Sequence, residues 1–168
     1  MRRCVILGLT ADARQEQVSE GYLAGMDDCL FKPVGLEELG HCLHRHMQRE
    51  EQADIATCMQ EIKHCLGPLT GNQPALIMPL LTAFISASDD DLLGLEQAAD
   101  VQDVPQFLDY VHRLKGGARI MGASQLVKAC GEAESDELDS LALPLVLERL
   151  QRSYEVVRLA IVQLQEAE

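Results

Sequence analysis

The sequence has 168 residues, a hydrophobic fraction of 47% and a formal net charge of −13 at pH 7. This length suits one medium domain, or a small domain plus a fragment, with a buried core. The negative charge argues against a nucleic-acid binder, because phosphate backbones are bound by clustered Lys and Arg. No apolar run approaches the roughly 20 residues that span a bilayer, and the scattered cysteines favour reduced thiols in the cytoplasm.

The first part of the chain predicts two strands that alternate with two helices. A continuous apolar run over residues 4–9 predicts a buried strand, and a polar, one-sided helix is expected over 12–25. A second short strand is expected over 29–31, and a helix with one apolar stripe over 36–47. This β-α-β-α order predicts α/β architecture with parallel strands.

A charged stretch follows and separates this part from the rest of the chain. Residues 48–56 predict a linker or a helical connection, and 54–66 predict a short helix that a Gly-Pro pair should end. We therefore expect an α/β fragment over 1–47, a linker with a short helix over 48–68, and a helical domain over 69–168.

The last hundred residues predict helices only. The first should begin near Pro74, with Pro79 delaying or kinking its start. A capping box opens a second helix over 103–121, a third helix is marked by apolar residues over 126–133, and the last has apolar residues spaced three and four apart over 147–164. Four such helices with short connections predict an antiparallel bundle, so the fold is mainly α after a partial α/β segment.

The helix over 103–121 carries the residues that point to chemistry. Its apolar stripe should consist of Phe107, Val111, Leu114, Ala118 and Met121. His112 lies about 140° from the centre of that stripe, with Lys115, Gly116 and Arg119 on its own side. A neutral imidazole is nucleophilic near neutral pH, and the two cations could offset the charge of an attached phosphoryl group. Helical position alone leaves an ordinary surface histidine as the alternative.

The run over residues 112–123, with Leu126, Cys130 and Glu134 after it, closely resembles the H-x-L-K-G signature of the histidine phosphotransfer (HPt) domain. The resemblance extends over residues 74–166. It implies that His112 is the phosphoacceptor, Lys115 its electrostatic partner and Gly116 a residue that gives clearance. Arg119 is added to this site from helix geometry.

Residues 9–11 and 25–33 resemble the last two β-α units of a response-regulator receiver domain, and this resemblance covers residues 4–47. It implies that Thr10 matches the switch hydroxyl and Lys32 the lysine that contacts the phosphoryl group. The acidic pair and the phosphoacceptor aspartate of a receiver lie on earlier strands. We therefore expect a receiver fragment that does not function as a receiver and is poorly stable alone.

A receiver tail followed by an HPt domain is the order found in unorthodox hybrid sensor histidine kinases. This order implies a phosphorelay intermediate in which His112 takes a phosphoryl group from a receiver aspartate and passes it to a response regulator. It implies no kinase activity and no cofactor or metal in this chain, with Mg²⁺ on the partner receiver. We expect receiver domains as partners, no nucleic-acid or direct membrane contact, and a cytoplasmic location. Anchoring of the parent protein in the inner membrane and the oligomeric state stay open.

Two other interpretations stay open. One is a helical bundle that docks receivers without carrying phosphate. The other is a metal-binding helical protein, since Cys and His are zinc ligands. The residues concerned are His41, Cys42, His44 and His46, with Cys58, His64 and Cys65 further along the chain. Their irregular spacing is more typical of solvated histidines, and Cys130 lies on an apolar stripe where a core thiol is expected.

Overall fold

The computed structural model describes residues 4–11, 14–135 and 138–167. The chain divides into two compact units, residues 1–52 and residues 53–168. Within the described residues, no helix combines the length and the apolar character that a membrane crossing requires.

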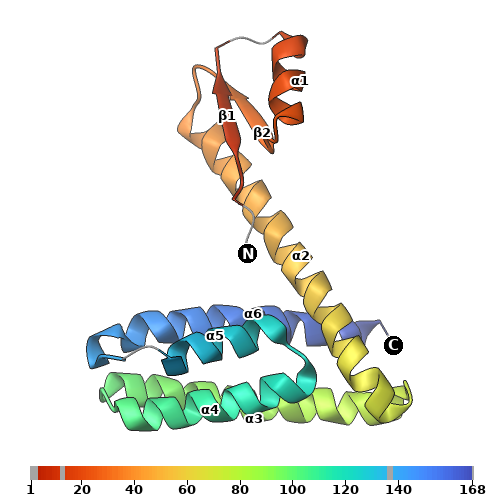
Figure 1. Ribbon diagram of the computed structural model, residues 1–168, viewed down its shortest axis with the longest axis vertical. Coiled ribbons are helices and arrows are strands. Elements are labelled where there is room, and N and C mark those ends of the chain that lie inside the picture. Colours follow the sequence, from red (N-terminus) through yellow and green to blue (C-terminus); the bar gives the residue numbers. More distant parts are fainter. Residues whose placement is uncertain (1–3, 12–13, 136–137, 168) are drawn as a thin grey trace. The chain divides into compact units, whose positions relative to one another are not determined.

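The first unit contains a small parallel sheet and two helical segments (Figure 1). Its elements are β1 (Leu7–Thr10), α1 (Gln15–Leu23), β2 (Asp28–Phe31) and the beginning of α2 (Leu36–Thr70). The strands pair in parallel, with Leu7 opposite Asp28 and Thr10 opposite Phe31. The predicted order and the parallel pairing are confirmed. The first strand starts three residues later than the apolar run suggested, and residues 12 and 13 of the expected helix lie outside the described residues.

The first unit has a small core. Among its described residues, the buried apolar side chains are Leu30 and Cys42, whereas large side chains such as Leu23 and Leu36 are exposed. Burial of apolar surface is the main favourable term in folding. The expectation that this segment is poorly stable alone therefore stays a prediction with a physical basis.

Helix α2 is continuous over 35 residues. The charged stretch over 48–56 is helical, because the residues Gln, Arg, Glu and Ala that dominate it are strong helix formers. The expectation that Gly67 and Pro68 end the helix was wrong by two residues. Pro68 lies in the last turn, where it removes one backbone hydrogen bond of the helix, and the Thr70 hydroxyl donates to the Leu66 carbonyl at 2.8 Å. The domain boundaries proposed at 47 and 68 stay predictions.

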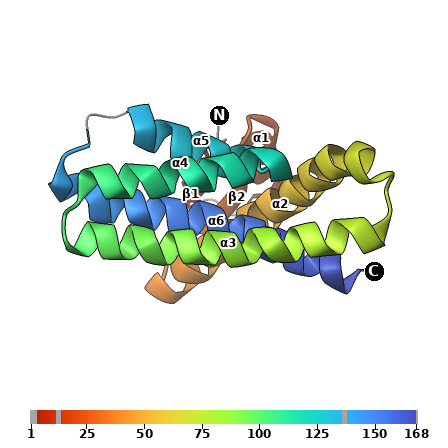
Figure 2. The same cartoon turned by 90° about the horizontal axis from the view of Figure 1, so that it is seen from below.

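The second unit is built on four helices, each of which contacts two of the others. Figure 2 shows these helices lengthwise, beside one another. They are α3 (Pro74–Asp100), α4 (Val104–Met121), α5 (Ser124–Ser135) and α6 (Leu143–Glu166), with the short 3₁₀ helix η1 (Ser140–Ala142) before α6. Helix α3 contacts α4 and α6, and α5 contacts α4 and α6. The predicted antiparallel four-helix bundle is confirmed. Pro79 does not delay α3, which begins at Pro74.

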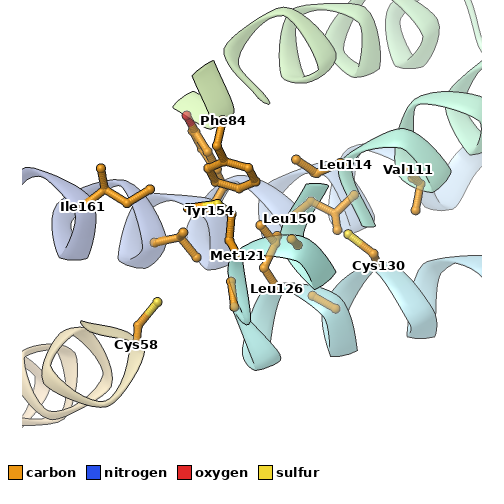
Figure 3. Packing of buried hydrophobic residues seen from close by; sticks show 14 of the residues in the cluster. Cys58, Phe84, Val111, Leu114, Met121, Leu126, Cys130, Leu150, Tyr154 and Ile161 are labelled. Atoms are coloured by element: carbon orange, nitrogen blue, oxygen red, sulfur yellow. The ribbon is translucent and has the colours of Figure 1, made fainter. Parts of the chain in front are cut away.

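The core of the bundle is filled by side chains from all of its helices (Figure 3). Residues in it include Phe84, Val111, Leu114, Met121, Leu126, Cys130, Leu150, Tyr154 and Ile161. The second part of α2 adds a stripe that the sequence did not assign to the bundle, namely Ile55, Cys58, Ile62 and Leu66. The Glu61 carboxylate fixes this segment, because it accepts hydrogen bonds from the hydroxyl and the backbone N–H of Ser124, where α5 begins. The bundle unit therefore contains a fifth helical segment.

Candidate functional site

Helix α4 is fixed at both ends. The Asp103 carboxylate accepts a hydrogen bond from the Gln106 backbone N–H at 3.0 Å, which caps the first turn. At the other end, Gly122 adopts a left-handed φ of 74°, a conformation that glycine accepts without steric cost. These ends agree with the predicted range and hold the side chains between them in a set orientation.

The two faces of α4 match the helical pattern of the sequence. The five predicted core residues, Phe107, Val111, Leu114, Ala118 and Met121, are all buried. The side chain of His112 is 80% exposed. The imidazole therefore lies on the solvent side of a rigid helix, where another molecule can reach it.

One carboxylate orients the imidazole and also binds the nearest lysine. Glu134, from α5, places its Oε1 atom 3.0 Å from Nδ1 of His112. Its Oε2 atom forms an ion pair with the Lys115 ammonium group. The Lys115 side chain is 14% exposed and that of Glu134 is 26% exposed, so both are partly shielded from water, unlike the ring.

This contact distinguishes the two ring nitrogens of His112. An ionised carboxylate can only accept hydrogen bonds, so Nδ1 is the nitrogen that carries the proton in the neutral ring. The lone pair then lies on Nε2, on the opposite side of the imidazole. The tautomer follows from the partner of Nδ1, and it leaves Nε2 free to act as a nucleophile.

The electrostatic environment keeps the Glu134 carboxylate ionised. The hydrogen bond from Lys115 is the largest influence and lowers the pKa of Glu134, as does the hydrogen bond from His112, whereas burial acts in the opposite direction. The sequence suggested that Lys115 is an unpaired cation beside His112, but the structure pairs it with Glu134. Its charge is shared with a carboxylate that also holds the ring.

Three glycines shape the surroundings of these side chains. A Cβ atom at Gly116 would meet nothing within 4 Å, so the surface next to His112 is open. A Cβ atom at Gly117 would lie 3.2 Å from the Phe84 ring of α3, so this glycine serves helix packing. On α5, a Cβ atom at Gly131 would lie 3.4 Å from Nζ of Lys115, and the missing side chain gives the lysine its path to Glu134.

The two arginines of α4 have different environments. Arg119 is exposed and forms no ion pair with the residues that the structure describes. Arg113, which follows His112 in the sequence, forms an ion pair with the buried Asp91 of α3 at 2.6 Å and lies 5.3 Å from the centre of the Tyr110 ring. Arg113 is therefore bound to the bundle, and Arg119 is the arginine that stays available on the exposed face.

Glu134 is the side chain of this site whose contacts the sequence did not reveal. From the sequence, Glu134 was named only as one of the residues that match the HPt domain. A signal for it existed, because α4 and α5 form a hairpin whose turn lies at residues 122 and 123. Ala123 is equally far from His112 and Glu134, and equally far from Lys115 and Gly131. Residues at equal distances from such a turn face each other across the pair of helices.

The other predicted groups are only partly brought together. Of the four residues proposed as ligands over 41–46, Cys42 and His46 approach each other and Asp28, whereas His41 and His44 are exposed. Cys58 is buried in the bundle core, away from solvent. In the receiver-like segment, Thr10 and Lys32 are adjacent at the ends of the two strands, and the Lys32 backbone N–H donates to the Thr10 carbonyl at 2.7 Å. The roles that the resemblance gives to their side chains stay predictions.

Comparison with known proteins places the sequence of this chain in a family. The sequence pattern of the Hpt domain matches residues 79–167, which include α4 and α5. No solved structure gives a significant match to the chain.

Three sensor proteins are similar to most of the chain. The virulence sensor protein BvgS of Bordetella pertussis (strain Tohama I) is 34% identical over 164 residues, which cover 85% of this chain and 13% of that protein. The sensor protein EvgS of Escherichia coli (strain K12) is 28% identical over 149 residues, covering 86% and 12%. The sensor protein GacS of Pseudomonas syringae pv. syringae is 26% identical over 141 residues, covering 77% and 16%. The chain thus spans less than a fifth of the length of each of these relatives.

Proposed function

The chain belongs to the Hpt domain family, whose members are phosphorelay intermediates in two-component signalling, and from this premise we propose that His112 is its phosphoacceptor. The observation that supports this assignment most directly is the contact between Nδ1 of His112 and Glu134, on a ring that is 80% exposed. It leaves Nε2 unprotonated and accessible, as a nucleophile requires.

The chemical step is an in-line exchange of one bond at phosphorus. Nε2 of His112 attacks the phosphoryl group of an aspartyl phosphate on a receiver, the P–O bond to that aspartate breaks, and the aspartate leaves as a carboxylate. Nδ1 keeps its proton, and the positive charge that develops on the ring is offset by the Glu134 carboxylate. The reverse step moves the phosphoryl group to the aspartate of a response regulator. The contribution of this chain is positioning and charge.

Four residues assist His112 in this proposal. Lys115 supplies positive charge one turn along the helix, and Gly116 leaves space for the surface of the receiver beside the ring. Arg119 lies seven residues on, about 10 Å along the helix axis, so its charge acts on the phosphoryl group more weakly than that of Lys115. Glu134 is a positioning residue, since it acts through the imidazole and the lysine.

The proposed role needs partners that supply what this chain does not. We expect the chain to lack kinase activity and to hold no cofactor for the transfer, with Mg²⁺ on the receiver. The transfer then takes place with receiver domains in trans. By similarity to the three sensor proteins, the chain is proposed as the C-terminal part of a hybrid sensor histidine kinase, located in the cytoplasm, with anchoring of the parent protein in the inner membrane.

The direct test is phosphoryl transfer to the purified chain. A receiver domain phosphorylated with acetyl phosphate is incubated with the chain and Mg²⁺, and the bound phosphate is tested for acid lability and base stability. We expect the parent chain to be labelled and His112→Gln to be unlabelled. His64→Gln removes another exposed histidine of the same unit and should be labelled like the parent.

The same experiment distinguishes the alternative of a docking bundle. If the chain binds the receiver but His112 never acquires phosphate, the bundle is a docking module. Labelling of His112→Gln to the parent level would refute the assignment of the phosphoacceptor.

A further inference from the structure

Three side chains of the first unit converge outside the proposed phosphotransfer site. Asp28 is the first residue of β2, and Cys42 and His46 lie on α2. Oδ2 of Asp28 is 3.6 Å from Sγ of Cys42 and 3.1 Å from Nε2 of His46. The three donor atoms all lie within 4.8 Å of one another. A carboxylate, a thiol and an imidazole thus point at one spot.

Local structure produces this convergence. Cys42 and His46 are four residues apart on a helix, so their side chains lie on the same face one turn apart. The Asp28 carboxylate is oriented by its second oxygen, because Oδ1 accepts a hydrogen bond from the Cys29 backbone N–H at 2.9 Å. That bond directs Oδ2 toward the helix, as outer hydrogen bonds do for metal-binding carboxylates.

The distances agree with a tetrahedral zinc site. Zinc binds nitrogen and oxygen at about 2.0–2.2 Å and sulfur at about 2.3 Å, which places neighbouring ligand atoms about 3.3–3.6 Å apart in a tetrahedron. The measured separations of 3.1 and 3.6 Å fall close to this range. The third separation, between the donor atoms of Cys42 and His46, is within 4.8 Å, so a metal ion at the centre requires the three side chains to draw together.

The surroundings favour a bound cation but include competing groups. Cys42 is fully buried, and the His46 side chain is 12% exposed. Nη2 of Arg45 lies 3.5 Å from Oδ2 of Asp28, on a side chain that is 64% exposed and can turn into solvent. The Tyr22 hydroxyl lies 3.5 Å from Oδ1 of Asp28, and this contact can persist when a metal binds Oδ2. A thiolate and a carboxylate together neutralise the charge of a divalent cation.

We propose that Asp28, Cys42 and His46 bind one Zn²⁺ ion, with a water molecule as the fourth ligand. Binding replaces the proton of the Cys42 thiol, which is released to solvent, and forms the S–Zn bond. The ion joins the beginning of β2 to α2 in a unit whose described residues bury few apolar side chains. In small units of this kind, metal binding is coupled to folding and takes the place of a larger core.

The test uses the full chain with Zn²⁺ or Co²⁺ alone as the probe. Elemental analysis after dialysis should give one Zn²⁺ per chain. Co²⁺ should give the intense visible bands of a tetrahedral site and the ultraviolet charge-transfer band of a thiolate ligand. Cys42→Ser should lose the charge-transfer band, and both His46→Asn and Asp28→Asn should weaken metal binding at least tenfold. His44→Asn changes an exposed histidine of the same helix and should bind like the parent.

Folding and function are followed separately. Far-UV circular dichroism of each variant without metal shows whether α2 is retained, and amide exchange over residues 28–31 and 36–47 should slow when Zn²⁺ is added. Absence of stoichiometric zinc in the parent chain would overturn the proposal, as would retention of the thiolate band in Cys42→Ser. Equal loss of binding in His44→Asn would show that the metal binds surface histidines instead. Phosphoryl labelling of His112 should not depend on any of these variants.

Discussion

Glu134 binds two side chains through the two oxygens of one carboxylate. Oε1 contacts Nδ1 of His112, and Oε2 contacts the ammonium group of Lys115. An ionised carboxylate offers about four acceptor positions, so both contacts can exist together. Substitutions at this position can therefore separate the orientation of the ring from the neutralisation of the lysine.

Glu134→Ala should lower the rate of phosphoryl transfer to His112 about tenfold, because a hydrogen bond to a charged group contributes roughly 1.5 kcal/mol. Glu134→Gln should lose less, since its amide oxygen still accepts the proton of Nδ1. Single-turnover transfer from a phosphorylated receiver measures both rates. Glu132→Ala, which removes exposed ion pairs on the same helix, serves as the control and should leave the rate unchanged. Equal rates in the Ala and Gln variants would contradict the orienting role.

At this scale the sequence predicted positions better than contacts. The exposure of His112 follows from helical periodicity within α4, which is a local property. The ion pair of Lys115 depends on a residue of another helix, and the burial of Asp91 next to Arg113 does so as well. Such contacts require the packing of two elements, which single-sequence periodicity does not contain.

At the scale of elements, the adjacent glycines of α4 face different surroundings. Gly116 faces open space, and Gly117 faces the Phe84 ring of α3. The open space at Gly116 suits approach by another molecule, whereas Gly117 allows close packing of helix α3. The neighbouring hairpin of α4 and α5 brings Gly131 opposite Lys115.

Gly116→Ala should raise the free energy of unfolding by about 1 kcal/mol, because glycine disfavours an exposed helix interior by that amount. Gly117→Ala should be less stable than Gly116→Ala, since its Cβ would press on the Phe84 ring at 3.2 Å. Urea denaturation followed by circular dichroism measures both. In the transfer assay, Gly116→Ala should react more slowly than the parent despite its higher stability. A rate equal to that of the parent would remove the proposed clearance role.

The junction of α4 with the second part of α2 depends on Gly122. Alanine there would combine a left-handed φ of 74° with a Cβ atom 2.8 Å from Cβ of Cys65. We expect a loss of about 2–4 kcal/mol, from backbone strain of about 1–2 kcal/mol plus overpacking. Gly71→Ala has a similar φ of 61° and no contact closer than 3.8 Å, so it should lose only the backbone contribution. Equal losses in the two variants would show that α2 does not press on this site.

At the scale of the whole molecule, the bundle core includes ionisable groups whose burial favours the neutral form over the charged form. Burial raises the pKa of Cys130 to about 12 and that of Cys58 to about 11. Burial also raises the pKa of Tyr154, whose hydroxyl donates to Asp89 at 2.7 Å. In the unfolded chain these groups ionise at lower pH, so the unfolded state loses protons first as the pH rises.

The stability that these thiols contribute is complete below their ordinary pKa of 9.0 and is lost between that value and the raised folded-state values. Between pH 8 and pH 10, ionisation of each of these thiols in the unfolded chain should lower the free energy of unfolding by roughly 1 kcal/mol. Chemical denaturation at pH 8 and pH 10 measures the difference. Cys130→Ala should reduce this pH dependence, whereas Cys4→Ser, at an exposed thiol, should not. A free energy that does not change with pH would show that the thiols are not desolvated.

The bundle was predictable from the sequence because its helices repeat apolar residues at constant spacing, as Leu150, Tyr154 and Val157 do in α6. The contribution of residues 53–70 was not, because a charged stretch separates them from other apolar segments and a Gly-Pro pair is usually a helix end. Helix α2 continues through both the charged stretch and the Gly-Pro pair, because strong helix formers precede the pair. The apolar stripe of its second part is buried by packing with the bundle, which the sequence pattern of α2 alone does not reveal.

The exposure of His112 has a consequence for signalling fidelity. In the proposed transfer, a reacting nitrogen that stands clear of its own protein can be reached by any receiver whose aspartate fits over it, so the imidazole itself does not discriminate between receivers. Selection must then come from exposed side chains on the surface around it, such as Arg119 and others like it. Since these are exposed, they can change without disturbing the core. A few substitutions on this surface would therefore change which receivers react with the chain. Transfer between unrelated partners would be limited by the fit between the surface around His112 and that of the receiver.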